Sequence, residues 1–394
     1  MVTISGHHIR GTRAALGPVL LRPAILMLGL ALLFSSFGWR SAHAEIMLID
    51  AAGREVRLEK PATRIVTNES LLLLSLALID ADPAAKIVGW AAPRRLDSGV
   101  LAAFRKRFPQ SMDIPEVGGV LPTKSSAEAI LSARPDIFVV SIWDPGWNDI
   151  VEILKSASVP TIFLDSPKNS TLSPAEVTAF SMTLLGRAIG QDARAREYAG
   201  YVKERYRLIE ERLKRATDRP SVLIDAHAGA VCCSSPGASN RMTEAVEMAG
   251  GHSIGADVPG YDGQLSAEFV LGADPRVYIA TGGPHLAAQG GLVVGGGVSA
   301  QSARASLRTA VGRDFRGELT AVRSGRAYAV SHQLSISALS FLVFECFAKW
   351  LHPELFGDLD PDRTLAEINE RFMAIPLEGT FWIGLKEDAA AAPQ

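Results

Sequence analysis

The chain has 394 residues, of which 47% are hydrophobic and 21% are charged, and its formal net charge is −2. This is an ordinary globular composition with ample core material, and the length suggests two or three domains. No basic run is interleaved with aromatic residues, so we expect no nucleic-acid partner.

The first 44 residues differ in character from the rest. They contain four arginines and no acid, and an apolar run from Ala24 to Trp39 is followed by Ser41-Ala42-His43-Ala44. This pattern predicts a secretory signal peptide cleaved after Ala44 and a periplasmic mature protein. The apolar run is shorter than the roughly 20 residues of a membrane anchor, and no cysteine follows it to carry a lipid. Removing residues 1–44 leaves 36 Lys and Arg against 42 Asp and Glu, a net charge of −6.

Three cysteines remain in the mature chain: Cys232, Cys233 and Cys346. In an oxidising compartment they predict one disulfide and one free thiol. A bridge between the neighbours closes a strained ring, and a bridge from Cys346 to either of them is the alternative, so the sequence leaves the pairing open. No other Cys or His lies at ligand spacing beside them, which disfavours a zinc site.

Between residues 45 and 172, short apolar runs alternate with helical patterns. The expected strands lie at 63–67, 86–90, 137–141 and 161–165. The expected helices lie at 71–79, 101–108, 127–133 and 150–157. Continuous apolar strands that alternate with helices predict a parallel sheet covered on both faces, which forms an N-terminal lobe.

The alternation stops at residue 173. Ser173 offers a capping hydroxyl, Pro174 suits the first turn, and Glu176 suits the third helical position. No proline follows until after residue 216, and apolar residues recur at three-to-four spacing from 198 to 214. We therefore predict one long helix over 173–217 that bridges two lobes. Because a continuous helix resists bending, ligand binding should change the lobe spacing only slightly.

Strands and helices alternate again over residues 218–388, which predicts a C-terminal lobe. The expected strands lie at 221–225, 277–281 and 326–330, and a glycine-rich loop lies at 282–297. The expected helices lie at 240–249, 267–273, 337–351 and 364–372. Residues 389–394 should form a frayed tail.

A repeated block supports two lobes of related build. Ser126–Asp136 and Ser266–Arg276 each place a glutamate seven residues before a proline, and each is followed by an apolar strand. A helix, a turn and a buried strand therefore occur twice in matching order.

The two glutamate-to-proline blocks, the long helix between them and the segments Ile49–Val56 and Lys60–Val66 resemble a known family. This family comprises periplasmic binding proteins for iron-siderophore complexes, haem and cobalamin, which serve ATP-binding cassette importers. The resemblance covers nearly the whole mature chain. It implies two α/β lobes, each with a mainly parallel sheet flanked by helices, and one long bridging helix.

The same resemblance implies the ligand and the partners. The expected function is capture of a ferric siderophore, a small-molecule chelate of iron(III), and its delivery to an inner-membrane permease. Haem or cobalamin is the alternative ligand. The protein should be a monomer without a cofactor of its own.

In this family one surface glutamate per lobe reaches an arginine of the permease, and Glu128 and Glu268 match those positions. Charge pairs at an interface rim orient partners more than they tighten binding. The alternative is that each glutamate is only a solvent-exposed residue on the polar face of its helix.

In such a fold the ligand binds between the lobes, on loops at the carboxyl ends of the strands. The candidate ligand-binding residues in these loops are Asn68, Trp90, Arg94, Arg95, Trp143, Trp147, Arg241, Tyr261 and His332. The guanidinium groups of Arg94 and Arg95 fit the oxygens of an anionic chelate, and the tryptophans of the 143–147 segment can wall an apolar ligand. The alternative for each of these residues is that it is simply buried in the core or solvated at the surface and does not contact the ligand. His227 and His285 also follow strands but are not predicted to bind the ligand.

Residues 45–172 contain no His, Tyr or Cys, which are the side chains that a bare transition metal would need from the first lobe. The metal should therefore arrive already chelated. Haem remains possible through one axial Tyr or His of the second lobe. There is no His-Glu-x-x-His motif and no Gly-x4-Gly-Lys-Ser/Thr motif. We therefore do not expect an enzyme, and a secreted hydrolase or metal-site enzyme is a remote alternative.

Overall fold

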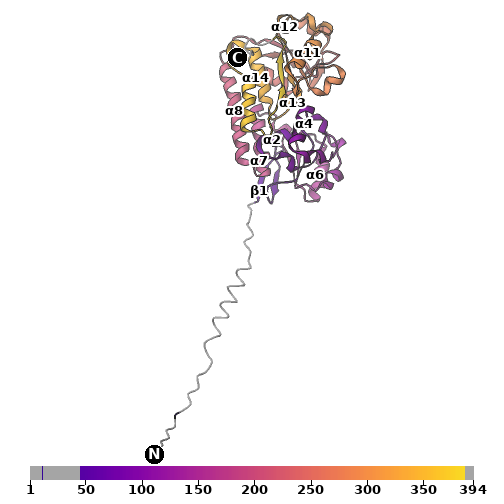
Figure 1. The fold of residues 1–394 in the computed structure, drawn as a ribbon, viewed down its shortest axis with the longest axis vertical. Coiled ribbons are helices and arrows are strands. Elements are labelled where there is room, and N and C mark those ends of the chain that lie inside the picture. The colour runs from indigo at the N-terminus through magenta and orange to yellow at the C-terminus, as the bar shows by residue number, and fades with distance from the viewer. Residues whose placement is uncertain (1–10, 12–44, 387–394) are drawn as a thin grey trace, which may run out of the picture. The chain divides into compact units, whose positions relative to one another are not determined.

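The computed structural model describes Gly11 and residues 45–386, and two sheets organise the second of these ranges (Figure 1). The predicted signal peptide, apart from Gly11, and the predicted tail at 389–394 lie outside the described residues, so both stay predictions. Within the described part of the chain, no helix has the length and apolar character needed to cross a membrane.

The N-terminal lobe is built on a four-stranded parallel sheet of order β4-β3-β5-β6. Its strands are β3 (Ile65–Thr67), β4 (Ile87–Trp90), β5 (Ile137–Val140) and β6 (Thr161–Phe163). Its helices include α2 (Leu72–Ile79), α4 (Ser98–Arg107), α5 (Ala127–Ser132) and α6 (Trp147–Ser156). Nearly every strand residue is buried because helices and loops cover both faces of the sheet. The antiparallel hairpin of β1 (Ile46–Ile49) and β2 (Glu55–Leu58) precedes this sheet.

The C-terminal lobe contains a five-stranded sheet of order β15-β13-β11-β7-β9, in which only β15 is antiparallel. Its strands are β7 (Ser221–Asp225), β9 (His252–Ser253), β11 (Val277–Gly282), β13 (Ala327–Ser331) and β15 (Trp382–Gly384). Its helices include α9 (Arg241–Met248), α10 (Ala267–Ala273), α11 (Ala300–Val311), α12 (Thr320–Ser324), α14 (Ser340–Leu351) and α16 (Pro361–Arg371).

The two sheets share one connectivity. In each lobe the parallel strands follow the order second, first, third, fourth in the chain. The repeated block has the same place in both, since α5 leads into β5 and α10 leads into β11. Ser126 and Ser266 cap these helices by accepting hydrogen bonds from the amides of Ala129 and Phe269. The related build that the sequence repeat predicts is therefore confirmed.

The prediction of one continuous helix over 173–217 is wrong. Two helices occupy this segment, α7 (Pro174–Ile189) and α8 (Asp192–Leu213). Gly190 ends α7 in the left-handed region at φ +76°, a conformation that glycine adopts without strain. The chain reverses there and brings α8 back against α7, so closely that a Cβ atom on Gly186 would lie 2.2 Å from the Cβ of Ala195. The pattern of apolar residues continues through this turn, so periodicity alone did not reveal it.

Helix α8 is the long helix that joins the lobes, and its 22 residues span about 33 Å. At its start, the amide of the Gln191 side chain donates to Asp80 Oδ2 at 3.2 Å, next to the end of α2. At its other end, Arg212 forms an ion pair with Asp358 at 2.5 Å. In Figure 1, α8 lies alongside α14 of the C-terminal lobe.

A second junction between the lobes lies at the start of α4. Asp97 Oδ1 caps this helix by accepting from the amides of Gly99 and Val100, while Asp97 Oδ2 accepts from the amide of Gly296 at 3.1 Å. Gly296 belongs to β12 (Gly295–Gly296) of the C-terminal lobe. The two backbones approach so closely that a Cβ atom on Gly99 would lie 1.9 Å from the carbonyl oxygen of Gly296.

We predict that Gly99→Ala destabilises the protein by about 1–3 kcal/mol, because the new methyl group has no room at this junction. Gly200→Ala is the matched control, since Gly200 is an exposed residue of α8 with open space around its Cα. There the substitution should stabilise by about 0.5–1 kcal/mol through helix propensity. Urea denaturation of the two variants provides the measurement, and equal midpoints would contradict the close approach of the lobes.

Candidate ligand-binding site

A cavity of about 630 Å³ lies between the lobes, a size that suits a drug-sized ligand. Its walls come from loops after the strands of the N-terminal lobe, from α7, and from the beginnings of α9 and α14. Nine serines line it: Ser75, Ser141, Ser166, Ser170, Ser181, Ser239, Ser335, Ser337 and Ser340. Leucine, methionine, valine and phenylalanine side chains lie between them. The wall therefore offers uncharged hydrogen-bonding groups on an apolar background.

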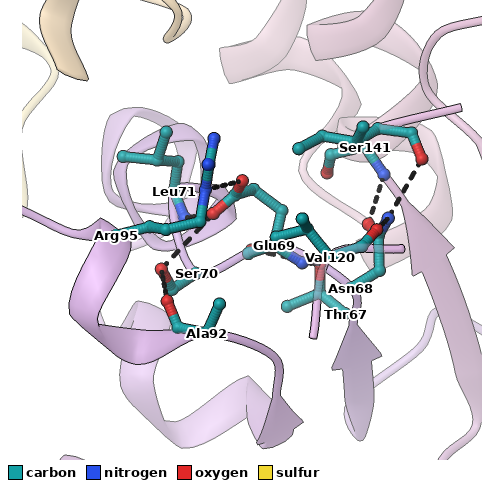
Figure 2. A network of polar contacts seen from close by, with 10 residues as sticks. Thr67, Asn68, Glu69, Ser70, Leu71, Ala92, Arg95, Val120 and Ser141 are labelled. Carbon is teal, nitrogen blue, oxygen red and sulfur yellow. Dashed lines mark hydrogen bonds and ion pairs between the residues drawn. The ribbon is translucent and has the colours of Figure 1, made fainter. Parts of the chain in front are cut away.

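Glu69 and Arg95 form an ion pair on the N-terminal side of the cavity (Figure 2). Arg95 Nε donates to Glu69 Oε2 at 2.8 Å, and Glu69 Oε1 accepts from the amide of Leu71 at 3.3 Å. Burial raises the pKa of Glu69, and the charge of Arg95 opposes that rise. Arg95, a predicted ligand-binding residue, thus lines the cavity with its charge already matched by a carboxylate.

Asn68 lies beneath the cavity rather than on its wall. Its Nδ2 donates to the carbonyl oxygens of Val120 and Ile142 at 3.1 and 3.0 Å, and its Oδ1 accepts from the amide of Ser141 at 2.8 Å (Figure 2). These bonds connect loops that follow different strands. Asn68 therefore shapes the cavity by holding its loops in place.

The three remaining aromatic candidates of the N-terminal lobe separate into two groups. Trp143 lines the cavity and is 37% exposed. Trp90 and Trp147 are buried in the hydrophobic core, where Trp147 Nε1 donates to the carbonyl of Ile142 at 3.1 Å. Arg94 is exposed and does not line the cavity, although it neighbours Arg95 in the chain.

On the C-terminal side, Arg241 and Tyr261 line the cavity. Arg241 pairs with Glu244 at 2.7 Å, and its charge also acts on Asp165 of the opposite lobe, whose pKa burial raises. Burial likewise raises the pKa of Tyr261, so its phenol stays a hydrogen-bond donor. Both cations that line the cavity have carboxylate partners, and Asp165 adds a further carboxylate to the wall, so the cavity offers no unmatched positive charge.

Three histidines meet near this cleft, at the carboxyl ends of the adjacent strands β7, β11 and β13. His227 Nδ1 lies 3.3 Å from His285 Nε2, and the rings of His227 and His332 are 3.9 Å apart between centroids. The charge of Arg95 acts on both His227 and His332. Of the three, only His332 was predicted to bind ligand. Each histidine follows a predicted strand. Had the order of these strands in the sheet been predicted, the three histidines could have been placed side by side.

Burial favours the neutral form of all three imidazoles. Burial lowers the pKa of His227, His285 and His332, and it lowers that of His332 to about 3. His332 Nδ1 lies 3.2 Å from the hydroxyl of Thr281, and the amide of Gln333 lies 3.2 Å from His285 Nδ1. Neutral imidazoles retain a lone pair that can bind a metal.

One further group could hold a metal ion. Within residues 45–386, the set of at least three His, Cys, Asp or Glu side chains whose ligand atoms all lie within 4.8 Å of one another is Asp225, Cys232 and Cys233. The structure also decides the pairing that the sequence left open, because Cys232 and Cys233 form a disulfide and Cys346 is free and buried.

A hydrolase pattern occurs once in the C-terminal lobe. Residues Gly251–Gly255 read Gly-x-Ser-x-Gly, which in hydrolases presents a nucleophilic serine on a sharp turn. Here Ser253 ends β9 and is fully buried, so its hydroxyl cannot reach a substrate. This segment gives no support to the hydrolase alternative.

Glu128 and Glu268 occupy matching positions at the starts of α5 and α10, and both are exposed. Hydrogen bonds from its own backbone amide and from the Ser266 hydroxyl lower the pKa of Glu268. Each lobe thus presents one glutamate on the helix that precedes its third strand.

The sequence matches the periplasmic binding protein family over residues 65–329. A cobalamin-binding protein of Halobacterium salinarum is 27% identical over 233 residues, which are 58% of this chain and 57% of that protein. The chain thus spans little more than half the length of that relative.

Among solved structures, the TroA-like periplasmic binding protein FepB from Veillonella parvula superposes with a TM-score of 0.78 at 24% identity, over 86% of this chain and all of that one. The molybdate-bound protein MolA from Haemophilus influenzae superposes with a TM-score of 0.65 at 14% identity, over 84% of this chain and 99% of that one. These likenesses show a shared two-lobed fold.

The chain therefore belongs to the periplasmic binding protein family. Members of this family are substrate-binding proteins of ATP-binding cassette importers.

We predict that acidification destabilises the protein in part through His332. Its pKa falls from 6.5 when unfolded to about 3 when folded, so its contribution to stability is complete above pH 6.5 and is lost as the pH falls toward 3. The loss should stay below about 1.4 kcal/mol per pH unit, because solvent reaches part of the ring. Urea midpoints measured from pH 7.5 to pH 4.5 should fall less steeply in His332→Gln than in the wild type.

The exposed His252 provides the control. His252→Gln also removes one imidazole from the same lobe, at a site outside the histidine cluster, and so shows how much of any change comes from the loss of an imidazole as such. Parallel profiles for the wild type and His332→Gln would contradict the neutral state of His332.

Proposed function

We propose that this protein captures a ferric siderophore of low net charge, such as a ferric hydroxamate, in the periplasm and delivers it to an ATP-binding cassette permease. The observation that carries the proposal is the charge balance of the cavity. Arg95 is matched by Glu69, Arg241 is matched by Glu244, and serine hydroxyls supply most other polar groups.

This balance favours one class of chelate over another. A ferric catecholate complex carries several negative charges, and burying it here would require cations without carboxylate partners. Neither arginine that lines the cavity meets that condition. A ferric hydroxamate is nearly neutral and presents carbonyl oxygens and methylene groups, which suit serine hydroxyls and apolar walls.

Cobalamin or haem is the second candidate. The cobalamin-binding relative supports cobalamin, whose large surface is also nearly neutral. The exposed ring of Trp143 offers a flat apolar wall for a macrocycle. The neutral imidazoles of His227 and His285 offer nitrogen ligands to a metal with an open axial position.

The proposal extends to location and partners. The mature protein would begin after Ala44, act in the periplasm as a monomer, carry no cofactor of its own, and bring chelated iron(III) to the permease. Docking would use Glu128 and Glu268, which are exposed at matching places on the two lobes.

Tryptophan fluorescence tests the ligand. The mature protein is titrated with a ferric trihydroxamate, a ferric tricatecholate, haem and cobalamin. We predict saturable quenching by the hydroxamate, and a loss of most of the signal change in Trp143→Phe because Trp143 is the tryptophan on the cavity wall. The ferric complex can also lower the fluorescence by absorbing light without binding. An excess of iron-free hydroxamate should restore the fluorescence only where the quenching comes from binding. A response to cobalamin or haem alone would keep the transport role and overturn the siderophore.

Charge reversal tests the docking surface. Glu128→Lys and Glu268→Lys should each reduce ligand-stimulated ATP hydrolysis by the importer about tenfold or more. The new lysine would repel the arginine of the permease that the glutamate is proposed to contact, which disfavours docking. Ligand affinity measured by fluorescence should not change. Glu152→Lys is the control, since it reverses an exposed glutamate on α6. Equal loss in all three variants would contradict a specific role for the matched pair.

A further inference from the structure

The group formed by Asp225, Cys232 and Cys233 lies apart from the ligand cavity, since none of the three lines it. Asp225 is the last residue of β7, and the following loop brings both cysteines back beside its carboxylate. Asp225 and Cys233 are fully buried, while Cys232 is partly exposed beside the exposed Val231. A small ion can therefore approach from the side of Cys232.

One oxygen of Asp225 has no partner. Its Oδ2 accepts from the hydroxyl of Tyr278 at 2.6 Å and from Arg316 Nη1 at 3.1 Å. Its Oδ1 is buried without a hydrogen bond. A buried carboxylate oxygen that accepts nothing is unfavourable and calls for a function or a ligand.

The charges around this group suit a divalent cation. Arg316 is fully buried, and its single positive charge balances the buried carboxylate of Asp225, while its second partner, Asp314 at 3.2 Å, is exposed to solvent. Two cysteine thiolates would add two negative charges, and a divalent ion would cancel both. A metal bound by these three residues thus leaves the buried site neutral, which avoids the cost of an unpaired buried charge.

We propose that reduction of the Cys232–Cys233 disulfide opens a binding site for a thiophilic divalent cation such as Zn²⁺ or Cd²⁺, with two thiolates and Asp225 Oδ1 as its ligands. A dithiol reductant supplies two electrons and two protons to the disulfide and is itself oxidised to a disulfide. The cation then displaces both thiol protons into solvent as it binds the two sulfur atoms. In the oxidised protein the sulfur atoms are joined to each other, so the site is closed to metal.

The backbone holds the ligands together after the bond opens. The amide of Ala226 donates to the carbonyl of Ser234 at 2.7 Å, and the amide of Leu265 donates to the carbonyl of Cys233 at 3.0 Å. Strand β8 (Ser234–Pro236) then pairs with β10 (Asp262–Gln264). Because both ends of the loop are fixed, the cysteines stay beside Asp225 without the disulfide.

Cadmium binding tests the site. The mature Cys346→Ser protein, which lacks the third thiol, is reduced with dithiothreitol, freed of it without oxygen, and titrated with Cd²⁺. A thiolate-to-cadmium charge-transfer band that saturates at one ion per chain is expected in the reduced protein and not in the oxidised one. Adding Cys232→Ser or Cys233→Ser should abolish the band, and circular dichroism should stay that of the parent.

Asp225→Asn tests the third ligand and should weaken cadmium binding by about tenfold or more. Because this change also removes the buried charge partner of Arg316, the two serine variants decide the test if Asp225→Asn fails to fold. The proposal is overturned if a thiol assay counts two new thiols in the reduced protein while no charge-transfer band develops. It is equally overturned if the serine variants bind Cd²⁺ as tightly as their parent.

Discussion

The carboxylate of Asp97 caps α4 in one lobe and accepts a hydrogen bond from Gly296 in the other, which sets the distance between the lobes at that point. Two further connections fix the spacing. Helix α8 is tied to the first lobe at its N-cap, Gln191, which bonds to Asp80, and to the second lobe near its end by Arg212, which pairs with Asp358. The amide of Ala374 donates to the carbonyl of Ala77 in α2 at 2.8 Å, so the chain beyond α16 returns to the first lobe. We therefore expect the cavity to be largely formed before any ligand enters.

If the width of the cavity is fixed in this way, its electrostatics should decide ligand selectivity more than any closure of the lobes. The arginines of its walls are paired within their own lobes, so neither lobe presents a cation without a carboxylate partner to an anionic ligand. Selectivity should then depend on shape, on hydroxyl contacts and on the low cost of burying a neutral chelate. The permease would recognise the spacing of Glu128 and Glu268 rather than a large conformational change.

Much of this fold could be predicted from the sequence, because buried parallel strands form short apolar runs and because the block at Ser126 recurs at Ser266. The turn at Gly190 was missed, since apolar periodicity continues from α7 into α8 and only the left-handed glycine marks the reversal. The candidate site was predicted less well for a different reason. A sequence shows that Arg95 follows a strand, but it does not show that Glu69, twenty-six residues earlier, neutralises it.

The histidine cluster likewise depends on contacts between residues that are far apart in the sequence. His227, His285 and His332 are separated by more than forty residues, and they meet only because β7, β11 and β13 are neighbours in the sheet. The roles of Trp90 and Trp147 depended on burial, which the loop composition did not reveal.

A measurement of the distance between the lobes, with and without ligand, tests their fixed spacing most directly. Spin labels on Lys155→Cys of α6 and Ala305→Cys of α11 place one exposed probe on each lobe, while the native cysteines are bridged or buried. Double electron–electron resonance then measures their separation with and without a bound chelate. We expect a change of about 1–2 Å at most, whereas a shift of about 10 Å or more would show a hinge closure and contradict a fixed spacing of the lobes.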